Sequence, residues 1–181
     1  NDADLDLYNE YFGGGMSSIV FQEMREARGL AYSARAYMST PTYADGTYSF
    51  TAYIATQNDK MKQAIEAFDE IINTMPESEA AFNVAKESYI NQVRTLRYTK
   101  ASVLYAFINA RDMGLDYDRA RDVFEKVQTM SLDDVKAVQQ QWVKDRNYYY
   151  LILGDSKNLD LNYLRTLGPI TFLSQEQIFG Y

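Results

Sequence analysis

The 181-residue sequence contains no histidine and no cysteine. These residue types supply most protein ligands for zinc, iron and copper, and histidine is the usual general base of hydrolytic enzymes. Their absence excludes an ordinary transition-metal site, a Ser-His-Asp triad, thiolate chemistry and disulfide bonds in this chain. Carboxylates, lysine, tyrosine and arginine remain for chemistry, and we find no carboxylate spacing that suits a hard cation.

Positively charged residues are in the minority. The sequence has 18 Lys and Arg residues against 25 Asp and Glu residues, which gives a formal net charge of −7 at pH 7. Nucleic-acid binding depends on clustered cations that displace counterions from phosphates, so this balance excludes it as the main function. Long-range steering by negative charge favours basic peptides, provided that the charge faces the ligand.

Long apolar runs and a leader sequence are also missing. No apolar run approaches the roughly 20 residues that span a bilayer, so we expect no membrane span. No charged and then apolar leader stands at the N-terminus. The sequence begins at Asn1, without methionine and inside a predicted helix, so we expect a fragment of a longer protein.

Apolar residues are plentiful. They make up 46% of the sequence, enough for one core, and we expect residues 1–181 to form a single domain. Helical periodicity and end signals predict helices over residues 4–12, 17–28, 59–76, 78–98, 100–113, 118–128 and 132–144, with a short helix through 163–164. A period of two predicts an antiparallel pair of strands over 31–40 and 46–57. The segments 148–153 and 170–172 are predicted to be a returning strand and a last extended piece. This order favours an α+β fold, in which helices pack on one face of a mainly antiparallel sheet.

A glycine-rich run and a tyrosine run each have a second interpretation. Gly13–Gly15 followed by Ser17–Ser18 suggests a phosphate cradle at a helix start. The pattern lacks the lysine of a P-loop and follows a helix instead of a strand, so we interpret it as a tight break between helices. Tyr148–Tyr150 suggests a stacking platform for bases, but a predicted strand favours alternate packing into the core and onto the surface.

Acidic residues gather at two predicted helix starts. Asp2, Asp4 and Asp6 lie around the start of the first predicted helix and, like Asp133 and Asp134, are interpreted as solvated or helix-initiating charge. Ser131 and Asp134 resemble a capping box, with Asp in place of the usual Glu. Neither group indicates a metal site.

Two neighbouring segments carry a family resemblance. Residues 13–18 (GGGMSS) and 21–33 (FQEMREARGLAYS) are similar to the glycine-rich helix start and the R-E-x-R-G-L-x-Y element of pitrilysin/insulinase C-terminal domains. Residues 150–155 (YLILGD) and 167–169 (LGP) resemble the last core strand of that domain and the segment after it. The resemblance covers nearly the whole chain.

In that family, an N-terminal domain binds zinc through an inverted H-x-x-E-H motif and a distal Glu, and a similar domain faces it across a closed chamber. This chain lacks the motif and resembles the facing domain, with the opening strands of the domain missing. The resemblance implies the substrate-binding, chamber-forming half of a zinc metalloendopeptidase, which is inactive by itself. It also implies a peptide substrate and a zinc-bearing N-terminal domain in the same chain or in a companion chain.

The resemblance assigns a substrate-gripping arginine and tyrosine, seven positions apart, to Arg25 and Tyr32. A guanidinium suits peptide carbonyl oxygens, and a phenol can donate to a developing oxyanion. Without the resemblance, Arg25 and Arg28 would be interpreted as cations that the helix dipole favours in the last turn before Gly29. We interpret Arg28 as structural.

Two alternatives remain open at this point. One is a non-catalytic structural or assembly homologue, as occurs in the core proteins of respiratory chains. The other is an unrelated α+β binding module. The lack of cysteine and the resemblance to bacterial forms favour a bacterial periplasm or cell envelope.

Overall fold

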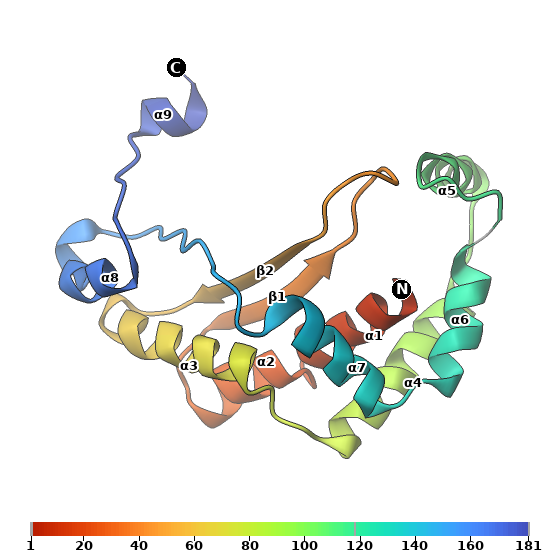
Figure 1. Ribbon diagram of the computed structural model, residues 1–181, viewed down its shortest axis with the longest axis horizontal. Coiled ribbons are helices and arrows are strands. Elements are labelled where there is room, and N and C mark those ends of the chain that lie inside the picture. Colours follow the sequence, from red (N-terminus) through yellow and green to blue (C-terminus); the bar gives the residue numbers. More distant parts are fainter. Residues whose placement is uncertain (1, 118, 181) are drawn as a thin grey trace.

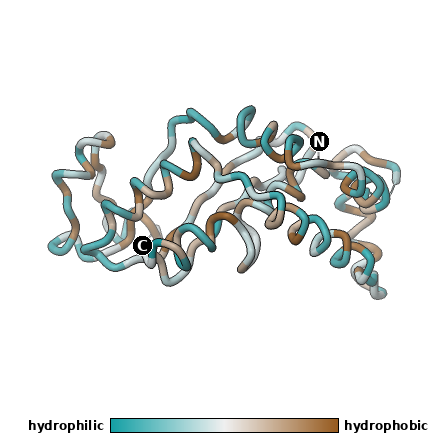
Figure 2. Tube along the Cα trace, turned by 90° about the horizontal axis from the view of Figure 1, so that it is seen from below, coloured by the Kyte–Doolittle hydropathy of each residue, from teal (hydrophilic) through white to brown (hydrophobic). Residues whose placement is uncertain are grey.

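A computed structural model describes residues 2–117 and 119–180 (Figure 1). The elements follow the chain in this order: α1 (Asp2–Phe12), α2 (Ile19–Phe21), the π-helical turn η1 (Gln22–Ala27), β1 (Ser33–Ser39), β2 (Ser49–Ala55), the 3-10 turn η2 (Asn58–Lys60), α3 (Met61–Asn73), α4 (Glu79–Thr95), α5 (Lys100–Asp112), α6 (Arg119–Thr129), α7 (Leu132–Val138), the π-helical turn η3 (Gln139–Val143), the 3-10 turn η4 (Ser156–Asn158), α8 (Leu161–Leu167) and α9 (Gln175–Phe179). Hydrophobic and hydrophilic residues alternate along the helices (Figure 2), as expected for helices with one buried face.

Helix α1 lies at the centre of the core. Its side chains Leu7, Tyr8, Tyr11 and Phe12 are fully buried, because α4, α6, α7 and β1 all pack against it. Burial of each large apolar side chain stabilises the fold by roughly 1.5–3 kcal/mol. The N-terminal helix therefore organises the elements that follow it in the sequence.

Polar groups on α1 reach partners far along the chain. The Tyr8 hydroxyl donates to Gln139 Oε1 at 2.6 Å, and Gln139 Nε2 donates in turn to the Ile72 carbonyl. The Tyr11 hydroxyl donates to the Pro76 carbonyl at 2.9 Å. Burial raises the pKa of Tyr8 well above its ordinary value, so this phenol stays a neutral donor. These bonds satisfy polar groups that would otherwise destabilise the core.

Two acidic residues of α1, Asp4 and Asp6, form ion pairs with cations of α6. Asp6 Oδ2 lies 2.9 Å from Arg119 Nη2, and Asp4 Oδ2 lies 2.6 Å from Lys126 Nζ. Both cations belong to α6, so the charges fix α6 against α1. Asp4 and Asp6 lie near the start of α1, as the interpretation of solvated or helix-initiating charge expects. The sequence did not indicate their ion pairs, because it does not reveal that α6 returns to α1.

Helix starts follow the sequence signals. Ser78 Oγ accepts from the Ala81 amide at 3.1 Å at the start of α4. The predicted capping box is confirmed at α7, where Asp134 Oδ2 accepts from the Ser131 amide at 2.8 Å. These hydrogen bonds lower the pKa of Asp134. Each such cap typically contributes about 1 kcal/mol.

Strands β1 and β2 form an antiparallel hairpin, as predicted, in which Ser33 pairs with Ala55 and Ser39 with Ser49. Along β1, the buried residues Ala34, Ala36 and Met38 alternate with outward-facing residues. Helices α1 and α2 pack against β1. The α+β class and the packing of helices on one face are thus confirmed.

The end of α1 meets β1 through the backbone. A Cβ atom on Gly13 would lie 2.0 Å from the Ala36 carbonyl oxygen, so only glycine permits this approach. Beside it, the Asn9 side chain forms two hydrogen bonds with the backbone of Met38. Asn9 Nδ2 donates to the Met38 carbonyl at 2.8 Å, and Asn9 Oδ1 accepts from the Met38 amide at 2.6 Å. Asn9 thus pairs with the backbone at the edge of β1, as a neighbouring strand would. The break between helices at Gly13–Gly15 is confirmed.

Two predicted extended segments form no strand. Residues 148–153 and 170–172 have no regular secondary structure among the described residues, and α9 follows the second segment. A run such as 148–153 has strand composition, but a strand needs a neighbour that pairs with its backbone. No described strand other than β1 and β2 provides that neighbour.

We predict that Gly13→Ala destabilises the fold. The added methyl group overlaps the Ala36 backbone, which cannot rotate away, so we expect a loss of about 1–3 kcal/mol in the free energy of unfolding. Chemical denaturation followed by circular dichroism measures it. Gly15→Ala is the control, because a Cβ atom at Gly15 meets nothing within 4 Å. Equal stability of the two variants would contradict the close contact.

We also predict that Tyr8→Phe costs about 1–3 kcal/mol, because it leaves buried Gln139 Oε1 without its donor. Thermal unfolding of the variant compared with Tyr149→Phe tests this, since Tyr149 is 99% exposed. A melting temperature for Tyr8→Phe as high as that of the control would rule out a stabilising role for the hydrogen bond.

Candidate functional site

Arg25 and Tyr32 lie on either side of a reversal in the chain. Arg25 belongs to η1, in which the Arg28 amide donates to the Glu23 carbonyl five residues earlier. Single π-helical turns of this kind are frequent at functional sites. Gly29 then adopts a φ of 57°, which glycine tolerates without strain and which turns the chain toward β1.

The reversal brings the two predicted site residues together. The Arg25 guanidinium carbon lies 6.0 Å from the centre of the Tyr32 ring and 5.0 Å from that of Phe21. Tyr32 is 85% exposed, and among the described residues no group accepts a hydrogen bond from its hydroxyl. Within residues 2–117 and 119–180, the one ion pair of Arg25 is a long contact of 3.7 Å to its neighbour Glu26. The site thus presents a cation and a phenol whose donors are available to a ligand.

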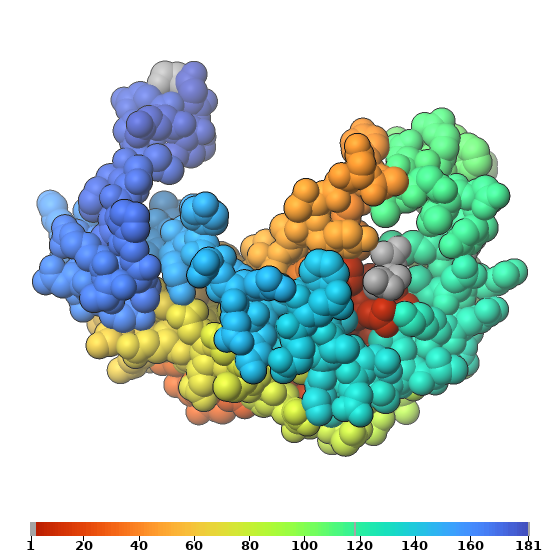
Figure 3. Space-filling model, viewed as in Figure 1, coloured from red at the N-terminus to blue at the C-terminus, as the bar shows by residue number. Residues whose placement is uncertain are grey.

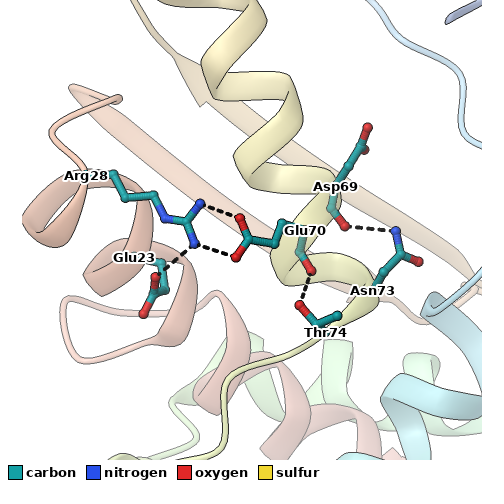
Figure 4. Close-up of polar contacts among 6 residues, drawn as sticks. All are labelled: Glu23, Arg28, Asp69, Glu70, Asn73 and Thr74. Carbon is teal, nitrogen blue, oxygen red and sulfur yellow. Dashed lines mark hydrogen bonds and ion pairs between the residues drawn. The ribbon is translucent and has the colours of Figure 1, made fainter.

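Arg28, one helical turn after Arg25, is engaged within the protein (Figure 4). Its guanidinium donates to both oxygens of Glu70 on α3, at 2.8 and 3.1 Å, and lies 3.4 Å from Glu23. The hydrogen bond from Arg28 lowers the pKa of Glu70. Bidentate pairs of this kind fix geometry as well as charge. Arg28 therefore joins the end of η1 to α3, in agreement with its structural interpretation.

A large cavity of about 1110 Å³ opens beside Tyr32. It is lined by β2, by one side of α3, by residues 29–32 and by residues 146–153. Figure 3 shows the surface hollowed between the hairpin and the C-terminal segment. Most of the lining side chains are apolar, such as Phe50 and Phe68. No sequence motif indicated this cavity, because it unites segments that lie far apart in the chain.

One polar pair stands in the lining of the cavity. The Tyr150 hydroxyl donates to both carboxylate oxygens of Asp69, each at 3.0 Å. Burial and the nearby Asp69 carboxylate raise the pKa of Tyr150 to about 12. Burial also raises the pKa of Asp69, although the Tyr150 hydrogen bond opposes this effect. The pair ties residues 146–153 to α3.

The described residues do not fit a metal centre. No group of three or more His, Cys, Asp or Glu side chains within residues 2–117 and 119–180 could hold a metal ion.

Over the same ranges, no helix is both long and apolar enough to cross a membrane.

Comparison with known families and proteins agrees with these features. Residues 1–89 match the family described as the peptidase M16 inactive domain. An uncharacterised zinc protease of Bacillus subtilis is 39% identical over 72 residues, which is 40% of this chain and 17% of that protein. One of Mycobacterium bovis is 25% identical over 156 residues, which is 83% of this chain and 34% of that protein. The chain thus spans about a third or less of these relatives.

Solved structures show the same fold. The peptidase M16 inactive domain from Pseudomonas fluorescens matches with a TM-score of 0.62 and 19% identity, over 77% of this chain and 34% of that one. A conserved protein from Enterococcus faecalis matches with a TM-score of 0.64 and 18% identity, over 76% of this chain and 32% of that one. Residues 1–89 thus match the peptidase M16 inactive domain, and the chain shares the fold of a solved domain of that description.

Proposed function

We propose that this chain is the substrate-binding, chamber-forming half of a zinc metalloendopeptidase. The proposal is carried by the exposed pair of Arg25 and Tyr32, whose donors are left open to a ligand. The family match to an inactive domain supports it. The proposal is also supported by the similar proteins, which are named as zinc proteases.

The two side chains have distinct tasks in this proposal. The Arg25 guanidinium donates to carbonyl oxygens of the bound peptide and holds its backbone. The Tyr32 hydroxyl donates to the oxygen of the scissile carbonyl, where negative charge develops during attack. Zinc and the water that it activates are supplied by an N-terminal domain in the same chain or in a companion chain. This chain then contributes orientation and charge stabilisation without any metal ligand.

We further propose that residues 1–181 belong to one domain whose sheet includes strands beyond β1 and β2. Residues 148–153 have strand composition, yet they lie unpaired across the cavity from β2. Two extended backbones that flank an apolar space would both gain hydrogen bonds from strands inserted between them. This arrangement would also account for the size of the cavity.

We predict that Arg25→Ala and Tyr32→Phe, made in the full-length protein with its zinc-bearing half, each lower kcat by about 10²-fold, as expected for loss of a transition-state donor. Steady-state hydrolysis of a fluorogenic peptide measures the effect. Both side chains are exposed, so the melting temperature should stay unchanged. Unchanged turnover in both variants would reject the assignment and favour a non-catalytic structural homologue.

Arg28→Gln is predicted to act on stability instead. The variant loses both bonds to Glu70, so we expect a lower melting temperature but wild-type kcat for the folded enzyme. The pKa of Glu70 is lowered in the folded state. The stabilisation is therefore present above the unfolded pKa of Glu70 and is lost as pH falls through its folded pKa. Melting curves of both proteins should converge in acid, and a difference that persists there would contradict this role.

A further inference from the structure

The segment that leads from η1 to Tyr32 has no regular secondary structure. Residues 29–32 follow η1 and precede β1, and Gly29 turns the chain between the two elements. The side chain of Tyr32 is 85% exposed, so packing around its ring contributes little to its position. A donor on such a segment meets the substrate in one place only if other groups hold the backbone that carries it.

Backbone hydrogen bonds hold two amides of this segment. The Leu30 amide donates to the Met24 carbonyl at 2.9 Å, which ties the segment to η1. The Tyr32 amide donates to the Ala55 carbonyl at 2.9 Å, which ties its other end to β2. The carbonyl groups of the segment find their partners elsewhere.

Two side chains from the stretch after β2 bind these carbonyl groups. The Thr56 hydroxyl donates to the Leu30 carbonyl at 2.6 Å. Four residues later, Lys60 Nζ donates to the Gly29 carbonyl at 3.1 Å. Thr56 directly follows β2, and Lys60 ends η2. The stretch before α3 is thus joined to the segment that carries Tyr32 by side chains as well as by backbone.

The bond from Thr56 is the stronger of these two ties. It is partly buried, whereas the bond from Lys60 is exposed, so water competes less for it. A β-branched side chain is stiff at χ1, whereas the ammonium of lysine ends a flexible stem. Leu30 also packs against the core. The Thr56 hydroxyl therefore fixes the backbone two residues before Tyr32.

We propose that Thr56 is a positioning residue for Tyr32 and that Lys60 assists it. By holding the Leu30 carbonyl, the Thr56 hydroxyl keeps the chain reversal in one form. In that form the Tyr32 ring lies beside the Arg25 guanidinium. The inference rests on the proposed role of Tyr32 as a donor to the scissile carbonyl. Thr56 touches no reacting atom in this account, so it acts on turnover only through Tyr32.

The test uses the full-length protein with its zinc-bearing half and a fluorogenic peptide. Thr56→Val removes the hydroxyl and keeps the shape of the side chain, so we expect kcat to fall about 10-fold with little change in KM. Thr56→Ser keeps a hydroxyl and should restore kcat. The double variant of Thr56→Val and Tyr32→Phe should be no slower than Tyr32→Phe alone, because the two changes affect the same donor.

Thr166→Val is the matched control. The Thr166 hydroxyl donates to the Tyr163 carbonyl, also at 2.6 Å, within α8, so this variant loses the same kind of bond in another element. It should keep wild-type kcat. Lys60→Met provides a second test if Thr56→Val does not fold. It should lower kcat by a smaller factor, and Lys60→Arg should restore it.

Amide hydrogen exchange of residues 30–32 reports on the segment independently of activity, and it should be faster in Thr56→Val than in Thr166→Val. If Tyr32→Phe lowers kcat, then wild-type kcat in Thr56→Val, or additive losses in the double variant, would overturn the inference. If Tyr32→Phe leaves kcat unchanged, the proposed function fails instead. Exchange then decides the inference alone: equal rates in the two valine variants overturn it, and faster exchange in Thr56→Val retains it.

Discussion

The close contact between Gly13 and Ala36 is the constraint on which the rest of the structure depends. It allows the buried helix α1 to meet the backbone of β1 directly, and Asn9 completes that junction by pairing with Met38. The hairpin is thereby fixed against the core. Because Tyr32 directly precedes β1 and Arg25 belongs to η1, which contacts β1, the same junction sets the relative position of the two proposed site residues.

Three arginines within eleven positions illustrate how partners decide the role of a charge. Arg28 is bound to Glu70 and Glu23 and joins two elements. The Arg25 guanidinium carbon lies 5.0 Å from the ring centre of Phe21 and 6.0 Å from that of Tyr32, and Arg35 lies over the Tyr53 ring. An arginine whose donors are already used cannot bind a ligand without losing stability. Arg25, whose ion pair with Glu26 is a long contact of 3.7 Å, therefore has donors left for a ligand.

Much of the fold could be predicted from local patterns. Apolar spacing identified α1, α3 and α4, and the period of two identified both strands, because these signals depend on neighbours within a few residues. The same reasoning failed for 148–153, since a strand also needs a partner and the described sheet provides none. It also missed the partners of Asp4 and Asp6 on α6, which lie more than a hundred residues away.

The sequence by itself determined the chemistry that this chain cannot perform. Without histidine or cysteine it has no ligands for an ordinary zinc site, and no fold could change that. Its motif also singled out Arg25 and Tyr32. Only the tertiary structure decided that these two side chains lie together and that Arg28 is engaged. The reason is that composition and spacing specify which groups exist, whereas long-range packing specifies which of them remain without a partner.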